Sequence, residues 1–100
     1  MTYSLQILSE AADDIKEIAL WYKGISQELG SRFVAELYSG FNIMVANPNA
    51  WFNIGSRMKR YALSCFPYFI IFQVQNDLII VYAVIHARRN PKRWKRRIKG

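Results

Sequence analysis

The sequence has few cysteines, few prolines and no long apolar run. Cys65 is its only cysteine, which excludes an internal disulfide and a cysteine-based zinc site. The longest apolar run, residues 78–85, is far shorter than the roughly 20 residues that a membrane-spanning helix needs. The N-terminus lacks the basic region of a secretory signal peptide. We therefore expect a soluble, cytoplasmic protein that uses no metal and no cofactor.

Acidic residues are scarce in the second half of the chain. Residues 1–50 hold three basic and six acidic residues, whereas residues 51–100 hold eleven basic residues and Asp77 as their only acidic one. A core cannot bury so many unpaired charges, so we expect a positive surface near the C-terminus. Such a surface favours nucleic acid, an acidic protein segment or, less readily, an anionic membrane as partner. A solvated basic face without a partner is the alternative.

The hydrophobic pattern predicts one α+β domain over residues 1–100. Of its residues, 52% are hydrophobic and 15% aromatic, which is typical of a folded chain. Apolar periodicity predicts a helical hairpin over residues 9–46, with one apolar row from Ala11 to Ile25, a second from Leu29 to Met44, and Ser9 and Ser26 as N-caps. Alternation predicts strands at residues 3–8 and 57–64, and apolar runs predict strands at residues 67–75 and 78–86 with Asn76-Asp77 as the hairpin turn between them. The last three strands are expected to form an antiparallel meander, with residues 47–56 as a loop before it and a short basic helix or tail at the C-terminus. The last strand is apolar on both faces, which is typical of a central strand.

Short motifs occur in order over nearly the whole chain. They are Trp21-Tyr22, Leu29-Gly30-Ser31-Arg32-Phe33, Asn47-Pro48, Arg57 followed by Phe66-Pro67-Tyr68, and Ala83-Val84-Ile85-His86-Ala87-Arg88-Arg89-Asn90-Pro91 followed by Trp94. Together they resemble toxins of the RelE/ParE superfamily from type II toxin–antitoxin, or plasmid stabilisation, systems. The resemblance implies a β-α-α-β-β-β fold, with a helical hairpin packed on a mainly antiparallel sheet. It also implies a cognate acidic antitoxin that silences this chain in a hetero-oligomer.

Members of this superfamily act in one of two ways, by cutting mRNA in the ribosome or by blocking DNA gyrase. A metal-free ribonuclease needs a base, an acid and cations around the phosphate. Arg57, Lys59 and Tyr61 are predicted on one strand face, where the two cations could hold a phosphate and the tyrosine could stack on a base. His86 beside Arg88 could supply the acid or base. The alternative is that His86 is a hydrogen-bonded residue at the end of a strand.

Two departures from the nuclease pattern favour gyrase inhibition over mRNA cleavage. The chain has no tyrosine after His86 and no glutamate after Glu36. Nucleases of the superfamily usually carry a tyrosine near the C-terminus, and some use a glutamate as base. Its C-terminal motif is more like that of ParE-like members. A further group of residues is predicted to bind the target or nucleic acid: Arg60, Arg89, Arg93, Trp94, Arg96 and Arg97. A non-enzymatic, basic nucleic-acid-binding module is a third interpretation of the same residues.

Overall fold

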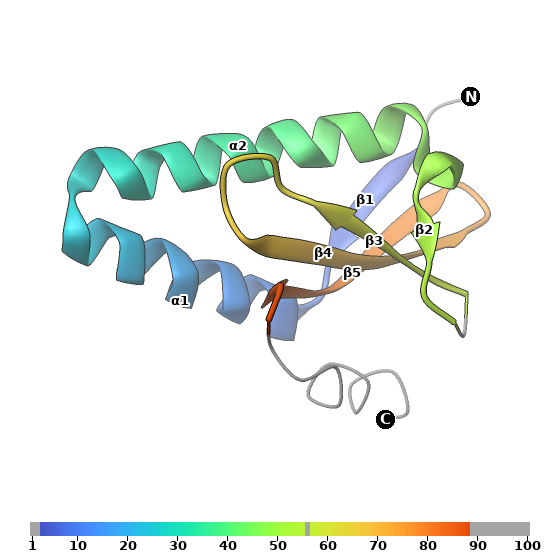
Figure 1. Ribbon diagram of the computed structural model, residues 1–100. Helices are drawn as coiled ribbons and strands as arrows, with labels where there is room; N and C mark the ends of the chain where they lie inside the picture. The colour runs from blue at the N-terminus through green and yellow to red at the C-terminus, as the bar shows by residue number, and fades with distance from the viewer. Residues whose placement is uncertain (1–2, 56, 89–100) are drawn as a thin grey trace.

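Two helices pack on one face of a five-stranded sheet in the computed structural model (Figure 1). The structure describes residues 3–55 and 57–88. The elements are β1 (Ser4–Ile7), α1 (Ser9–Ile25), α2 (Gln27–Ala46), the 3₁₀-helix η1 (Pro48–Ala50), β2 (Phe52–Asn53), β3 (Met58–Ala62), β4 (Tyr68–Gln75) and β5 (Leu78–His86). The predicted α+β class is confirmed. The segment predicted as a loop holds η1 and the two-residue strand β2, which are too short for a periodic pattern to reveal.

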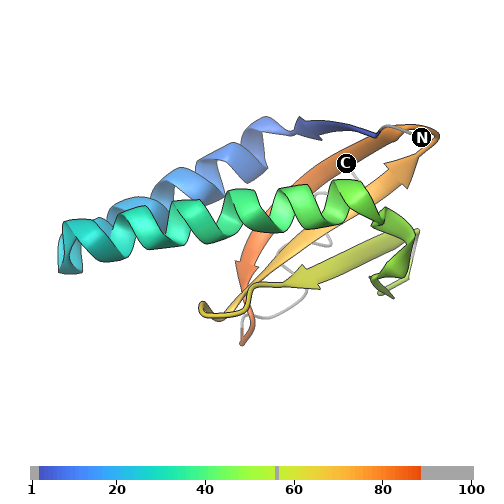
Figure 2. The ribbon, with the colours of Figure 1, turned by 90° about the horizontal axis from the view of Figure 1, so that it is seen from above.

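The strands are ordered β1-β5-β4-β3-β2, so β5 is an inner strand between β1 and β4 (Figure 2). β1 runs parallel to β5, in a register that pairs Ser4 with Leu78. β3, β4 and β5 form the predicted antiparallel meander, with Asn76-Asp77 as the turn before β5. Asn76 has a φ of 54°, a left-handed conformation that asparagine tolerates well. The last strand of the chain is therefore paired with the first.

The two helices begin in different ways. Ser26 caps α2 as predicted, since its hydroxyl accepts a hydrogen bond from the Leu29 amide at 3.0 Å. The prediction of Ser9 as the N-cap of α1 is wrong by one residue, because Leu8 holds that position. Leu8 offers no side-chain cap, but its amide donates to the Val81 carbonyl at 3.1 Å. The sheet therefore fixes the start of α1 where a capping side chain would otherwise do so.

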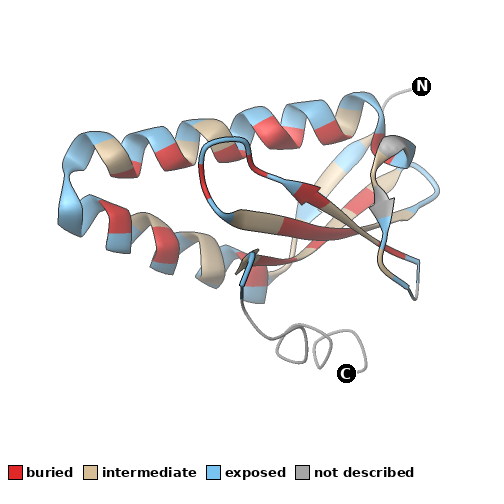
Figure 3. Ribbon diagram, viewed as in Figure 1, coloured by how far each residue is buried: buried red, intermediate tan, exposed pale blue. Residues whose placement is uncertain are grey.

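The main core lies between the helical hairpin and the sheet, where the buried segments of α1 and α2 face the strands (Figure 3). Its largest fully buried side chains from α2 are Phe33, Leu37 and Met44. They pack against residues of the sheet, including Ile70, Phe72, Ile79 and Val81. Gly30 lets the two helices approach closely, because a Cβ there would stand 3.1 Å from the Lys23 Cα. The predicted apolar rows of the two helices thus meet the sheet, although Ile25 at the end of the first row is 60% exposed.

A smaller cluster lies on the opposite face of the sheet. Met58, Ile71 and Ala83 are buried there, each from a different strand of the meander. The register between β4 and β5 shifts between Ile71 and Phe72, so the ladder contains a bulge. Burial on this second face accounts for the unbroken apolar run of β5.

Tyr22 makes the fold sensitive to alkaline pH. Burial raises the pKa of its hydroxyl above the usual 10.0, and the nearby Tyr68 hydroxyl raises it further. A tyrosine whose pKa is raised by folding stabilises the native state fully below pH ~10, and that contribution is lost as the pH rises through the folded pKa. We expect urea denaturation to show wild-type stability falling more steeply than that of Tyr22→Phe above pH ~10. Parallel curves for the two proteins across that range would contradict this prediction.

Candidate functional site

Arg57 lies in a turn and not on a strand. The predicted strand over residues 57–64 is shorter in the structure, because β3 begins at Met58. Arg57 has a φ of 64° and an exposed side chain, and it stands in the turn that the Met58 amide closes on the Gly55 carbonyl at 2.8 Å. The prediction that Arg57 shares a strand face with Lys59 and Tyr61 is therefore wrong. Its guanidinium is placed by a turn, whose geometry the alternating pattern did not reveal.

Lys59 holds the β2–β3 hairpin together. Its Nζ donates to Asn53 Oδ1 at 2.9 Å and to the Trp51 carbonyl at 3.4 Å. The side chain is half-buried, and Lys59 pairs across the ladder with Phe72 of the main core. These contacts give the ammonium group a local structural role.

Tyr61 belongs to the core. Its side chain is 8% exposed, and its ring stands edge-on to Trp51 with ring centroids 4.8 Å apart. A Cβ on Gly40 would come within 2.9 Å of the Tyr61 ring, so this glycine gives the ring its space against α2. Lys59 and Tyr61 do share a face, as predicted. In this position, however, the ring offers no open side for stacking on a base.

His86 ends β5 in a hydrogen-bonded position. Its Nδ1 accepts from the Arg88 amide at 3.1 Å, which requires the neutral ring to carry its proton on Nε2. Its ring stands edge-on to Tyr68 with centroids 5.2 Å apart. The side chain is half-buried, whereas that of Arg88 is exposed. The structural alternative for His86, a hydrogen-bonded residue at a strand end, describes its observed position.

The predicted catalytic residues are not brought together. β4 pairs with β5 on one side and with β3 on the other. At the start of β4, Tyr68 pairs with His86 of β5. Five residues further on, Gln73 pairs with Met58 of β3, the residue that follows Arg57. Five residue steps along β4 span about 17 Å at a rise of about 3.3 Å per residue. His86 and the turn that holds Arg57 therefore lie at opposite ends of the sheet (Figures 1 and 2). No single phosphate could contact both side chains in this arrangement.

Arg60 points to the face of the sheet opposite to the helices. Its guanidinium lies 4.5 Å from the centre of the Phe69 ring, within range of a cation–π contact. The remaining residues predicted to bind the target, Arg89, Arg93, Trp94, Arg96 and Arg97, lie outside the described residues. Within residues 3–55 and 57–88, no group of three or more His, Cys, Asp or Glu residues could hold a metal ion. Over the same residues, neither helix is long and apolar enough to cross a membrane.

Two carboxylates that the sequence did not single out bind backbone amides. Asp14 on α1 accepts from the Val84 amide at 3.0 Å, where β5 continues beyond the end of β1. Glu36 on α2 accepts from the Cys65 amide at 2.9 and 3.1 Å and so anchors the β3–β4 loop. A carboxylate that caps a distant amide has no sequence signal, because its partner is defined only by the fold. Both contacts tie the hairpin to the sheet.

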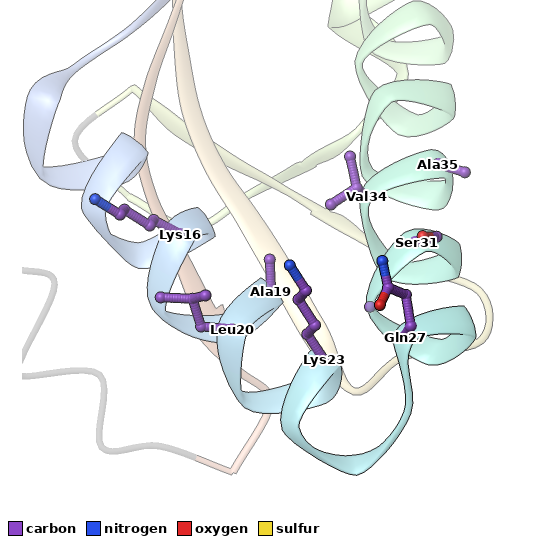
Figure 4. A pocket seen from close by; sticks show the side chains of 9 residues that line it. Lys16, Ala19, Leu20, Lys23, Gln27, Ser31, Val34 and Ala35 are labelled. Carbon is purple, nitrogen blue, oxygen red and sulfur yellow. The ribbon is translucent and has the colours of Figure 1, made fainter.

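A groove opens between α1 and α2 (Figure 4). This hairpin groove has a volume of about 530 Å³ and is lined by Lys16, Ala19, Leu20, Lys23, Gln27, Gly30, Ser31, Val34 and Ala35. Leu20 in its lining is 57% exposed, and Trp21, the next residue of α1, is 62% exposed. Trp21 therefore does not pack in the core. Trp21 lies off the buried row of α1, and that offset was the signal in the sequence for a second apolar surface.

Comparison with known proteins finds a matching family and similar solved structures. The family described as "ParE toxin of type II toxin-antitoxin system, parDE" matches residues 5–91. Among solved structures, the chain is similar to one described as "Chromosomal ParDE TA system from P. aeruginosa", with a TM-score of 0.76 and 21% sequence identity. That similarity covers 87% of this chain and 98% of the other, and at this identity it shows a shared fold. No curated protein matched the chain.

Proposed function

This chain belongs to the ParE toxin family of type II toxin–antitoxin systems, and we propose that it arrests growth by inhibiting DNA gyrase. In this proposal it is not a ribonuclease, and a cognate acidic antitoxin silences it in a hetero-oligomer. The proposed target places its action in the cytoplasm. The net charge of +7 supports an acidic partner, because complementary charge speeds association and disfavours other partners.

The observation that carries the proposal is the separation of the candidate catalytic residues. General acid–base catalysis requires its groups within hydrogen-bond reach of the reacting atoms. Here Arg57 and the strand-end His86 stand at opposite ends of β4, and Tyr61 is enclosed in the core. The described part of the chain thus supports binding to a target better than cleavage of RNA.

The proposal is tested with purified protein in two assays. We expect this chain, freed from its antitoxin, to inhibit the supercoiling of relaxed plasmid by DNA gyrase in a concentration-dependent manner. We expect intact mRNA when the same preparation is added to translating ribosomes. Transcripts cut on the ribosome, together with unimpaired gyrase, would overturn the proposal and favour the RelE-like activity.

Substitution of the candidate catalytic residues separates the two activities in cells. Arg57→Ala and His86→Ala are expected to arrest growth within about twofold of wild type, because substitutions away from a working site change energies by roughly 0.5 kcal/mol or less. A nuclease that used either residue as an acid, base or phosphate ligand would lose about 10²-fold or more. The measurement is colony formation after controlled expression, with protein levels matched by immunoblot. Loss of toxicity in both variants at equal protein levels would contradict the expectation.

A further inference from the structure

One side of α1 carries a row of side chains that neither the core nor the hairpin groove uses. Its members are spaced three or four residues apart, which places them on one side of a helix: Glu10, Asp14, Glu17, Trp21 and Ile25. Trp21 and Ile25 are 62% and 60% exposed, and Glu10 and Glu17 are exposed as well. This row, the α1 flank, is acidic at the start of the helix and apolar at its end.

The α1 flank faces away from α2. Lys16 and Lys23 mark the side of α1 that lines the groove (Figure 4), and at about 100° per residue the flank lies on the other side of the helix. Asp14 shows what the flank borders, since its carboxylate accepts a hydrogen bond from the Val84 amide at 3.0 Å. Val84 belongs to the part of β5 that continues beyond the end of β1. The flank therefore runs beside the C-terminal half of β5.

A row of aromatic contacts joins the apolar end of the flank to the end of β5. The ring centroids of Trp21 and Tyr22 are 5.0 Å apart. Tyr68 follows, with its ring centroid 6.3 Å from that of Tyr22 and 5.2 Å from that of His86. His86 Nδ1 in turn accepts from the amide of Arg88, the last described residue. The described chain therefore ends on the side of the fold where the flank is apolar.

The segment that follows is complementary to the flank in charge and in composition. Residues 89–100 hold seven basic residues, no acidic residue, and Trp94 and Ile98 as large apolar ones. Residues 10–17 hold four of the seven acidic residues of the whole chain. Complementary charge speeds and stabilises such contacts, and an exposed aromatic side chain is a frequent anchor. The α1 flank and residues 89–100 supply both halves of this combination.

The segment is also long enough for this contact. Glu10 and Trp21 are eleven residues apart on α1, which corresponds to about 16 Å at a rise of about 1.5 Å per residue. The twelve residues from 89 to 100 span about 18 Å as a helix and about 40 Å when extended. Either conformation covers the flank from its apolar end to its acidic end.

Two other exposed surfaces of the described fold disfavour a basic segment. The hairpin groove is lined by Lys16 and Lys23, and its described lining includes no aspartate or glutamate. The opposite face of the sheet carries Arg60, whose guanidinium lies over the Phe69 ring. Like charges at either surface would repel the segment. Of these three surfaces, the α1 flank alone has the complementary sign.

We propose that the α1 flank binds the chain's own basic segment, residues 89–100. In this contact Trp94 packs against Trp21, and the basic side chains beyond it face Glu17 and Glu10. The contact is independent of the proposed function and goes beyond it. Its consequence for the proposed function is competition, because a segment held on α1 reaches another partner only when the contact opens.

A spin label at the end of the segment tests the contact in the full chain. Cys65→Ser removes the only native thiol and Gly100→Cys accepts a nitroxide, so every basic residue is kept. We expect the NMR amide signals of residues 10–21 to lose intensity when the nitroxide is paramagnetic, relative to its reduced form. The loss should fade at about 1 M salt, where charges are screened beyond about 3 Å.

Two matched pairs of variants separate the contact from general effects. Glu17→Lys should reduce the signal loss at least about twofold, whereas Asp77→Lys makes the same charge reversal just before β5, far from His86, and should leave it unchanged. Trp21→Ala should also reduce the loss at least about twofold. Tyr38→Ala removes a ring of similar exposure from α2 and should leave it unchanged.

The same spectra contain the results that would overturn the inference. Signal loss confined to the sheet face that holds Arg60 would place the segment elsewhere. The absence of any signal loss would mean that the segment is not held on the described fold. A mixture of ¹⁵N-labelled chain without the nitroxide and unlabelled chain with it should show no loss on α1. Loss in that mixture would assign the contact to two different molecules.

The supercoiling assay tests the competition separately. We expect Glu17→Lys and Trp21→Ala to inhibit DNA gyrase at a concentration about twofold to fivefold lower than that of wild type, because the segment is no longer held on α1. Asp77→Lys raises the net charge equally and controls for charge alone. Inhibition by both flank variants at the wild-type concentration or above would overturn the competition. If the wild-type chain does not inhibit gyrase, the proposed function fails, and the spin-label experiment still decides the contact.

Discussion

Removal of residues 90–100 is expected to abolish the proposed inhibition of DNA gyrase while the described domain stays folded. The deleted segment carries Trp94 and six of the basic residues, so the net charge falls from +7 to +1. Positive charge raises the rate and strength of encounter with acidic targets by about 10-fold to 10³-fold, and tryptophan is a frequent anchor in interfaces. All strands and helices of the described fold end before residue 90. In the supercoiling assay, the same degree of inhibition should require a concentration of the truncated protein at least about 10²-fold higher than that of wild type.

Two controls assign the loss to charge or to the tryptophan. Glutamine at the six basic positions keeps Trp94, whereas Trp94→Ala keeps the charge. If electrostatic attraction to the target dominates, the glutamine variant should inhibit gyrase about as weakly as the truncated protein does. Its residual inhibition should then depend little on salt. A truncated protein that inhibits gyrase at the wild-type concentration would place the target surface on residues 1–89 instead. Circular dichroism melts of all variants should coincide with that of wild type.

Phe33→Ala is expected to cause the largest loss of stability. The side chain is fully buried, and its ring centroid lies 5.6 Å from that of Tyr22, 5.4 Å from that of Phe66 and 5.8 Å from that of Tyr68. Truncation of a buried phenylalanine to alanine costs about 3–5 kcal/mol. The total free energy of unfolding of a small domain is about 5–15 kcal/mol, so the variant should be marginally folded or unfolded. The measurement is urea denaturation followed by circular dichroism.

A surface aromatic on the same helix supplies the comparison. Tyr38 is 57% exposed, and Tyr38→Ala should change the free energy of unfolding by no more than about 1 kcal/mol. Phe33→Leu keeps much of the volume and should fall between the two alanine variants. Equal denaturation midpoints for Phe33→Ala and Tyr38→Ala would mean that the aromatic cluster does not hold α1, α2 and the sheet together.

The fold could be predicted in outline because its strong signals are local. The apolar row of α2, the cap at Ser26 and the alternation along β3 each depend on residues a few positions apart. Asn76-Asp77 marked the β4–β5 turn by its residue types alone. The first and last residues of the helices and strands were less predictable. The first residue of α1 is fixed by a hydrogen bond from Leu8 to Val81, which is 73 positions away in the sequence.

The candidate site could not be assembled from the same signals. Side-chain alternation places Lys59 and Tyr61 on one face but does not say which end of the sheet each residue occupies. In an antiparallel meander, the start of the first strand and the end of the third lie at opposite ends of the sheet. The predicted topology therefore already implied that residue 57 and His86 are far apart. Burial of Tyr61 depends on Trp51 and Gly40, which come from a 3₁₀ turn region and a helix that the strand pattern does not register.

The parallel pairing of β1 with β5 has a consequence for the timing of toxicity in the cell. Ser4 to Ile7 find their partners only in Leu78 to Val81, so the sheet cannot be completed until those late residues have been synthesised. Contacts with such large sequence separation slow folding, because the chain between them must be ordered first. Translation proceeds at about 5–20 residues per second, so the nascent chain spends several seconds without its native sheet. A folded toxin therefore emerges only late in synthesis or after it, and antitoxin already present in the cell can meet it as it forms.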